Sequence, residues 1–281
     1  MSRNSSRSSS PGDVVPGSAE EAPAPHRKEQ MQSRNAFTEL MAPKPQLPLE
    51  PISSSHKLSI NFKNRDDLGP YIENPSSYSP SIVLYYNDEF VAVRDRYPKS
   101  SLHLLLLPRE PTKARLHPFD AFDDPEFLQK VQTETKRLKR LAAAELRRMH
   151  SSTSAQEIAR QKAMDADPPP DELPAGRDWE KEIMCGIHAH PSMAHLHIHV
   201  LSVDRFSPCL RHRKHYNSFS TPFFIDVEDF PLAKDDARRH PGREGYLKRD
   251  FECWRCGKMF GNKFQRLKAH LEEEFLAWRT L

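Results

Sequence analysis

The chain has 281 residues, of which 37% are hydrophobic and 29% are charged, and its formal net charge is +3. It contains no apolar run of about 18 residues and no apolar stretch near the N-terminus, which argues against a transmembrane helix and a secretory signal. Four cysteines in this length argue against a disulfide framework and for a reducing compartment, while the small net charge neither requires nor excludes a nucleic-acid partner.

The first 56 residues contain eight prolines, a serine-rich opening and few periodic apolar positions. We therefore expect residues 1–56 to form a disordered tail. One short island in this tail places Phe37, Leu40 and Met41 on a single helical face. A nascent helix that packs nowhere and a short partner-docking motif both remain open for it.

From about residue 57 the apolar pattern becomes that of a folded domain, which we expect to span 57–220. The acidic residues and proline at 123–125 predict the start of a long helix, and the polar, proline-containing stretch at 150–176 predicts a disordered insertion. The expected elements are a helix at 66–72, a hairpin at 82–86 and 90–93, a strand at 103–107, a helix from 123 to about 149 with Phe127, Leu128, Val131, Leu138 and Leu141 on its buried face, and a strand at 195–202.

Histidine and apolar residues alternate along the last of these strands. Because side chains alternate faces in a strand, His195, His197 and His199 should share one surface while the residues between them enter the core. This pattern has three interpretations: a merely exposed polar face, a metal site built from His-x-His, and nucleophilic catalysis on a phosphate. We favour the third, because three imidazoles on one face are costly to bury without a use.

The turn just before this strand supports catalysis at phosphorus. It contains His188, His190 and Ser192, so further donors lie close to the mouth of the strand. A phosphoryl centre needs an attacking atom in line and hydrogen-bond donors around its equatorial oxygens. No carboxylate cluster accompanies the histidines to hold a magnesium ion, so we expect no catalytic metal.

The alternating segment resembles the signature of the histidine-triad superfamily, since the three histidines are followed by the apolar pair Val200 and Leu201. The resemblance implies an α+β fold, an antiparallel sheet with flanking helices, in which the middle histidine, His197, forms a nucleotidyl-histidine intermediate. It extends to residues 95–108, where an acidic residue holds the ribose hydroxyls, which implies Asp95.

The last 31 residues read as a separate module, within an expected linker and zinc finger at 221–281. Cys253 and Cys256 are followed by thirteen residues and His270, a spacing that predicts a structural zinc site. One helical turn beyond His270, the i+4 position favours Glu274 over Glu273 as the fourth ligand. A chance pair of cysteines is the alternative. Cys185 and Cys209 are most simply small buried hydrophobes.

A histidine triad followed by a basic loop and a zinc finger resembles the aprataxin family, and the Cys-Cys-His-Glu ligand set resembles its fungal members. The match runs from about Leu58 to the C-terminus except for 150–176, and we expect no forkhead-associated domain of the vertebrate kind in residues 1–56, which are too short and too polar for one. The resemblance implies a hydrolase that removes AMP from DNA 5′ ends left by abortive ligation, including RNA–DNA junctions. From this substrate we expect a nuclear protein, and we expect it to be a monomer. The reaction would proceed through a covalent adenylyl-histidine intermediate and would release AMP and 5′-phosphate DNA.

The resemblance also implies a role for each site residue. Phosphates of the DNA would meet a basic loop and the finger, and an aromatic wedge would cap the terminal base pair. His190 is expected to face solvent and His103 to pack in support of the pocket. The remaining assignments are His197 as nucleophile, His188 on the leaving phosphate, His199 and Ser192 on phosphate oxygens, Lys99 as a nearby charge, His195 as a hydrogen-bonding brace, Arg211, Arg213, Lys214, His215, Lys263 and Lys268 as DNA contacts, and Phe62 as the wedge.

Two other functions remain open. One is a histidine-triad hydrolase of small dinucleoside polyphosphates or nucleoside phosphoramidates, which would need neither the finger nor the basic loop. The other is a DNA-end-binding zinc-finger protein without catalytic activity. Deletion of residues 250–281 is expected to separate the first alternative from DNA repair, since only turnover of adenylated DNA would then be lost.

Overall fold

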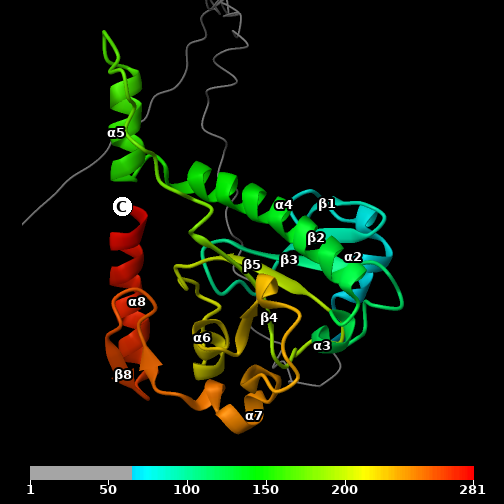
Figure 1. Ribbon diagram of the computed structural model, residues 1–281. Helices are drawn as coiled ribbons and strands as arrows, with labels where there is room; N and C mark the ends of the chain where they lie inside the picture. The colour runs from blue at the N-terminus through cyan, green and yellow to red at the C-terminus, as the bar shows by residue number, and fades with distance from the viewer. Residues whose placement is uncertain (1–64) are drawn as a thin grey trace, which may run out of the picture. The chain divides into compact units, whose positions relative to one another are not determined.

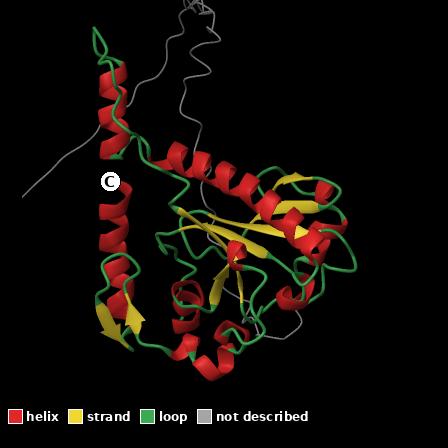
Figure 2. Ribbon diagram, in the orientation of Figure 1, coloured by secondary structure: helices red, strands yellow, loops and turns green. Residues whose placement is uncertain are grey.

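The computed structural model describes residues 65–281 (Figures 1 and 2). The expected disordered tail, the Phe37 motif and the Phe62 wedge therefore lie outside the described residues. The helices and strands are α2 (Gly69–Glu73), η2 (Pro75–Ser77), β1 (Val83–Tyr86), β2 (Phe90–Arg94), β3 (His103–Pro108), α3 (Pro118–Ala121), α4 (Pro125–His150), α5 (Ala155–Met164), β4 (Ile183–His188), β5 (Ile198–Ser202), α6 (Arg213–Ser220), β6 (Phe224–Asp226), η3 (Val227–Asp229), η4 (Ala237–Arg239), α7 (Pro241–Glu244), η5 (Tyr246–Lys248), β7 (Phe251–Glu252), β8 (Met259–Gly261) and α8 (Phe264–Arg279).

Six strands form one antiparallel sheet in the order β1-β2-β3-β5-β4-β6. The predicted hairpin is β1–β2, and the side chain of Asn87 closes its turn by accepting hydrogen bonds from the backbone N–H groups of Glu89 and Phe90. Strand β5 lies in the middle of the sheet between β3 and β4, so both edges of the histidine strand are hydrogen-bonded. The predicted α+β class with flanking helices is confirmed.

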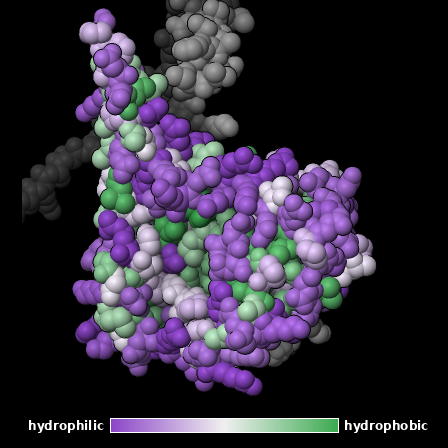
Figure 3. Space-filling view, in the orientation of Figure 1, coloured by the Kyte–Doolittle hydropathy of each residue, from purple (hydrophilic) through white to green (hydrophobic). Residues whose placement is uncertain are grey.

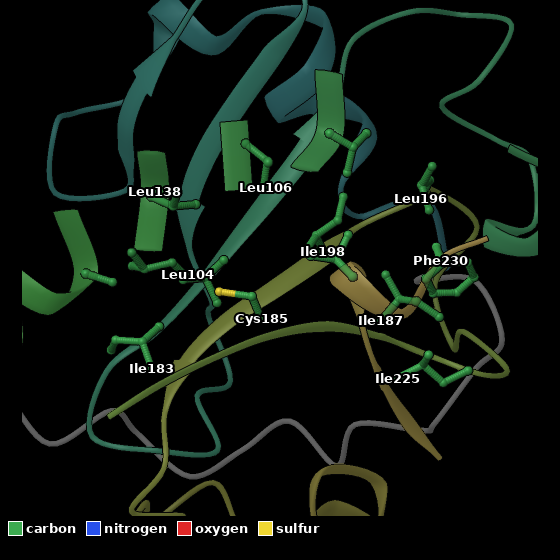
Figure 4. Close-up of a cluster of buried hydrophobic side chains, with 14 of the residues drawn as sticks. Leu104, Leu106, Leu138, Ile183, Cys185, Ile187, Leu196, Ile198, Ile225 and Phe230 are labelled. Atoms are coloured by element: carbon green, nitrogen blue, oxygen red, sulfur yellow. The ribbon is translucent and has the colours of Figure 1, made fainter. Parts of the chain in front are cut away.

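Helix α4 covers one face of the sheet (Figure 1). Its first turn is capped by the carboxylate of Asp124, which accepts from the backbone N–H groups of Glu126 and Phe127. Leu138 packs with strand residues such as Leu104 and Ile198 in the main core, as Figure 4 shows. Leu141, expected on the buried face, is 46% exposed, because the apolar stripe of the helix passes through its neighbour Ala142.

The opposite face of the sheet carries a second apolar cluster beneath α2. Leu105 and Leu107 of β3 and Val91 of β2 pack there with Ile72 of α2. Leu105 pairs directly with His199 in β5, so the histidines share this second face of the sheet. The alternation read from the sequence therefore separates the α4-facing core from the histidine-bearing face.

The expectation of a disordered insertion at 150–176 is wrong, because residues Ala155–Met164 form helix α5. The helix is held by Glu157, whose carboxylate accepts from Trp179 Nε1 at 2.9 Å and from Arg147 Nη2 at 3.0 Å. Polar contacts of this kind leave no hydrophobic periodicity in the sequence, so the pattern reads as a loop.

The C-terminal finger is not a separate module. Phe275 and Trp278 of α8 belong to the same hydrophobic cluster as α4 and the sheet, and residues 65–281 form one compact unit. Arg177 Nη1 donates to the carbonyl oxygen of Trp278 at 2.8 Å, and Ala155 N donates to that of Thr280 at 3.0 Å. Helix α8 therefore ends where α5 begins (Figure 1).

Among residues 65–281, no helix is long and apolar enough to cross a membrane. Figure 3 shows a surface that is predominantly hydrophilic in this view, with hydrophobic residues in scattered patches.

Candidate active site

Four histidines from three neighbouring strands form one cluster on the second face of the sheet. The ring of His199 lies 4.5 Å from that of His188, 4.8 Å from that of His197 and 5.1 Å from that of His103, measured between centroids. Strand β5 begins only at Ile198, so His197 stands just before it. The predicted alternation holds, because the intervening apolar residues lie in the main core.

A glycine makes room for this cluster. Gly186 of β4 pairs with His199 of β5 on one side and with Asp226 of β6 on the other. A Cβ atom at Gly186 would lie 2.3 Å from the carbonyl oxygen of Ile225, so any side chain here would push β6 away. The close approach brings Phe224 beside the imidazole of His188, at 6.3 Å between ring centroids.

The predicted nucleophile has one free nitrogen. His197 Nδ1 lies 2.7 Å from the carbonyl oxygen of His195. A carbonyl can only accept, so Nδ1 carries the proton and Nε2 keeps its lone pair. Burial lowers the pKa of His197, so this lone pair is available at neutral pH.

A chain of hydrogen bonds fixes the proton of His199. The backbone N–H of Lys99 donates to His103 Nδ1 at 3.1 Å, so the proton of His103 sits on Nε2 and points at His199 Nδ1, 2.9 Å away. His199 then carries its own proton on Nε2, which is buried without a partner among residues 65–281. Burial lowers the pKa of His103 to about 4 and that of His199 well below its usual value.

His188 presents a second unpartnered nitrogen, because its Nε2 atom is buried with no hydrogen bond in the described part of the chain. Burial, together with the neighbouring His197, His103 and Lys99, holds its pKa well below the usual value. A neutral ring keeps a proton on only one of its two nitrogens, and it carries no positive charge with which to neutralise a leaving phosphate.

His195 differs from its prediction. Its imidazole faces α2, where a Cβ on Gly69 would lie 3.2 Å from His195 Cε1, and its surroundings include Asp66, Glu73 and Arg115. The brace on the nucleophile is the backbone carbonyl of His195, and the side chain does not supply it. A strand pattern predicts the face on which a side chain lies, but it cannot predict that a backbone carbonyl makes the hydrogen bond to His197.

Of the residues predicted to bind the nucleotide, Asp95 and Lys99 lie near the histidine cluster, whereas Ser192 lies in an exposed loop. Asp95 lies against the cluster, with Oδ2 3.3 Å from His103 Nδ1, and Lys99 donates its ammonium hydrogen to the carbonyl of Tyr97 while its charge lowers the pKa of His199. Burial lowers the pKa of Lys99 itself. Ser192 is exposed in the loop before β5.

A carboxylate therefore does stand near the histidines. One ligand atom each from Asp95, His103 and His199 lie within 4.8 Å of one another, a grouping that could hold a metal ion. The nitrogens of His103 and His199 that face each other are joined by their own hydrogen bond, so binding a metal between them would break the proton chain.

The predicted DNA contacts also divide. Arg213 Nη1 donates to the carbonyls of Lys248 and Arg249, which ties α6 to the linker and leaves fewer donors for a phosphate. His215 has a pKa of about 4 because of burial, so it adds no charge at neutral pH. The side chains that stay exposed are Arg211, Lys214, Lys263 and Lys268.

The finger brings its four predicted ligands together. Single ligand atoms of Cys253, Cys256, His270 and Glu274 all lie within 4.8 Å of one another. Cys256 Sγ and Glu274 Oε1 each lie 3.1 Å from His270 Nε2. Two thiols, an imidazole and a carboxylate converging on one point fit tetrahedral zinc.

The same geometry favours Glu274 over Glu273. Glu273 faces the other imidazole nitrogen, 3.7 Å from His270 Nδ1, and its side chain is 80% exposed. The second oxygen of Glu274 is held by Arg255, an orienting contact of the kind that metal ligands commonly have. Cys185 is buried as expected, whereas Cys209 is only partly buried.

Two residues of the cluster carried no candidate function in the sequence. His103 was expected only to pack, yet it sets the proton of His199. Phe219 of α6 has no role predicted from the sequence, yet its ring lies 4.6 Å from that of His188. The period-two histidine pattern does not extend to β3 or α6, so no local signal links them to the site.

Comparison with known proteins agrees with this architecture. Residues 76–206 match the HIT domain, and residues 220–277 match the C2HE / C2H2 / C2HC zinc-binding finger. The chain is therefore a HIT-domain protein that carries a C2HE-type finger.

Relatives of known name share most of the chain. It is 35% identical to an aprataxin-like protein of Schizosaccharomyces pombe over 76% of this chain and 82% of the relative, and 38% identical to one of Saccharomyces cerevisiae over 73% and 93%. The crystal structure of the S. pombe aprataxin ortholog Hnt3 has a TM-score of 0.61 at 33% identity, covering 77% of this chain and 95% of that one. The structure of the Hnt3 complex with DNA has a TM-score of 0.59. This chain belongs to the aprataxin family.

Proposed function

We propose that this protein hydrolyses the phosphoanhydride of 5′-adenylated DNA, releasing AMP and 5′-phosphate DNA through an adenylyl-histidine. The observation that carries the proposal is the set of proton positions in the cluster. His197 Nε2 has a free lone pair, while His199 and His188 each present a buried, unpartnered Nε2 beside it. A nucleophile beside an unused donor, with a second unpartnered ring nitrogen in the same cluster, suits transfer at phosphorus.

In the first step, His197 Nε2 attacks the α-phosphorus of the AMP, and the bond from phosphorus to the bridging oxygen breaks. The electron pair of that bond leaves with the 5′-phosphate of the DNA. The proton on His197 Nδ1 remains hydrogen-bonded to the His195 carbonyl, which stabilises the positive charge that develops on the ring. In the second step, water attacks the same phosphorus and the bond from phosphorus to His197 Nε2 breaks. Its electron pair returns to Nε2, a proton of the water passes to solvent, and AMP and free His197 result.

The neighbouring groups hold the phosphate during both steps. The Nε2–H of His199 donates to a non-bridging oxygen, and His188 donates to the leaving phosphate. Lys99 adds positive charge near the reaction, and Asp95 accepts from the ribose hydroxyls. Ser192, which is exposed in the loop before β5, is assigned to hold a phosphate oxygen.

The proposal that the substrate is DNA is supported by exposed positive charge and by the similarity to a protein that binds DNA. Arg211 and Lys214 near α6, with Lys263 and Lys268 on the finger, are exposed and free to meet phosphates. The aprataxin ortholog Hnt3 has been solved in complex with DNA, and Hnt3 has also been solved with DNA and guanosine. We propose that the substrates are DNA nicks and ends, including RNA–DNA junctions. We also propose that the protein acts in the nucleus as a monomer.

Zinc belongs to the finger in this proposal. Cys253, Cys256, His270 and Glu274 would hold it, and when bound it supplies folding free energy to a finger whose apolar cluster is small. The reaction at His197 is assigned to the side chains of the cluster.

The small-nucleotide alternative needs a sharper test than deletion. Removing residues 250–281 would take Phe275 and Trp278 out of the main core and expose it, so both activities would fall together. Arg211→Ala and Lys214→Ala leave the core intact. The DNA proposal predicts weaker turnover of adenylated DNA with turnover of a nucleoside phosphoramidate unchanged.

The direct test is incubation with 5′-adenylated nicked DNA, without added divalent metal, and measurement of released AMP. The proposal predicts stoichiometric AMP and 5′-phosphate DNA. Binding of the DNA without release would favour the non-catalytic end-binding protein, and turnover of phosphoramidates alone would favour the small-nucleotide hydrolase.

A further inference from the structure

We propose that helix α6 couples the zinc-binding finger to the active-site histidines, with Phe219 and Tyr216 as positioning residues. The inference rests on the proposed function, and it adds that the finger supports the chemistry at His188 and His199 as well as the binding of DNA. The two positioning residues stand three positions apart, so they lie on neighbouring parts of the helix surface.

Phe219 is the contact between α6 and the cluster. Its ring centroid lies 4.6 Å from that of His188, 5.1 Å from that of His199 and 5.5 Å from that of His103. The side chain is 4% exposed. Phe219 thus excludes water from three imidazoles at once, and a shift of α6 would move or hydrate all of them.

Tyr216 is the contact between α6 and the finger. Its hydroxyl donates to the carbonyl of Glu252 at 2.7 Å and accepts from the backbone N–H of Trp254 at 3.0 Å. These two groups belong to the residues on either side of the zinc ligand Cys253. The position of Tyr216 is therefore tied to the backbone that presents this ligand to the metal.

Further contacts hold the same helix to the finger side. Arg205 Nη2 donates to the carbonyl of Phe219 at 2.9 Å, and its guanidinium lies 5.4 Å from the ring centroid of Trp254. Asn217 Nδ2 donates to the carbonyl of Arg249 at 2.8 Å. One short helix is thus fastened to the linker and the finger, and its remaining side packs on the catalytic histidines.

The coupling acts through burial of the imidazoles. His188 and His199 are faced by His197 from the segment before β5, by His103 from β3 and by Lys99 from the β2–β3 loop, with Asp95 beyond His103. Dry packing against Phe219 keeps the two rings neutral and their donors aimed. If the finger loosens, α6 loosens with it, water reaches the rings, and the geometry of phosphate binding degrades.

The test uses Tyr216→Phe, which removes the bridging hydroxyl and keeps the aromatic ring. Tyr246→Phe is the matched control, because Tyr246 is also buried and aromatic but does not bridge the residues around Cys253. The substrate is a nucleoside phosphoramidate, which is too small to contact the finger. We expect Tyr216→Phe to lower kcat by about tenfold with little change in KM. The acidic limb of its pH profile should also move to higher pH, and the control should do neither.

A second measurement does not depend on activity. Imidazole NMR signals of His188 and His199 are followed while zinc is removed from the wild-type protein with a chelator. The coupling predicts that both signals shift on zinc loss, and that they shift less in Tyr216→Phe. Unchanged signals, or a Tyr216→Phe enzyme that behaves like Tyr246→Phe, would overturn the inference. Failure of the proposed DNA reaction alone would leave the NMR result intact.

Discussion

The Nε2 atom of His103 lies 2.9 Å from the Nδ1 atom of His199. This contact joins β3 to β5. The backbone N–H of Lys99 fixes the proton of His103 on Nε2, and the hydrogen bond from there to His199 Nδ1 fixes the proton of His199 on its own Nε2. Because both rings must be neutral for the chain to hold, the site has an electrostatic consequence for folding. It is costly to protonate in the native state.

The free energy of unfolding should therefore fall as the pH falls. Burial lowers the pKa of His103 from 6.5 to about 4, and it lowers the pKa of His188, His197 and His199 as well. Below pH 6.5 the histidines of the unfolded chain bind protons, whereas those of the native cluster stay neutral. The free energy of unfolding therefore decreases as the pH falls from 6.5 to about 4. Urea denaturation across this range measures the slope. His103→Gln, which removes one such group, should make the slope shallower, and an equal slope in both proteins would refute this origin.

His197→Ala should abolish AMP release while leaving DNA binding intact. The variant removes the only side chain assigned to attack phosphorus, so the loss should exceed about a thousandfold. His190→Ala is the control, because His190 is exposed in the loop that follows β4. Single-turnover release of AMP measures the loss. Full activity in His197→Ala would end the assignment of the nucleophile.

Glu274→Ala should lower the zinc content of the purified protein, whereas Glu273→Ala should leave it unchanged. The reason is that Glu274 Oε1 reaches the ligand nitrogen of His270, while Glu273 lies by the other nitrogen. Metal analysis by mass spectrometry gives the stoichiometry. If the two variants lost equal zinc, neither carboxylate could be assigned from this geometry.

Arg177→Met should destabilise the protein by about 3 kcal/mol, because it removes the buried guanidinium that pairs with Glu182 and leaves that carboxylate only the hydrogen bond from Trp278 Nε1. Arg177 also donates to the carbonyl of Trp278 and lies between the rings of Trp179 and Trp278, at 4.5 and 4.7 Å. Lys181→Ala, which removes only an exposed ion pair, should cost less than about 0.5 kcal/mol. Chemical denaturation compares the two, and similar losses would contradict the role of Arg177 in holding α8.

DNA binding should weaken steeply with salt, and the exposed cations should account for the slope. Arg211→Ala and Lys214→Ala should each reduce the slope of log K against log salt by about 1 if each meets a phosphate. Arg213→Ala should change the slope less, since its guanidinium is engaged by backbone carbonyls. Fluorescence anisotropy at several salt concentrations measures this. A flat response would remove the basic loop from the interface.

Local patterns were sufficient for the elements that carry their signal in sequence. The hairpin turn at Asn87, the cap of α4 at Asp124 and the alternation at His197 and His199 each depend on residues within a few positions. The zinc ligands were likewise predictable, because a knuckle and a helical turn fix their spacing.

What the sequence could not supply is contact between distant segments. Helix α5 is held by Trp179, and the finger is held to the core by Trp278 and Arg177, so neither feature has a local pattern. The tautomer of His199 depends on a backbone N–H at Lys99, about a hundred residues away along the chain. Such links become visible only when the strands are placed side by side.

The claim on which the account depends is that His197 Nε2 carries the adenylyl group. The enzyme is mixed with 5′-adenylated nicked DNA, quenched in base within one turnover, and digested for peptide mass spectrometry. An AMP adduct should appear on the peptide at His197 and be absent from His197→Ala. An adduct on another residue, or AMP release by the wild type that persists in His197→Ala, would contradict it.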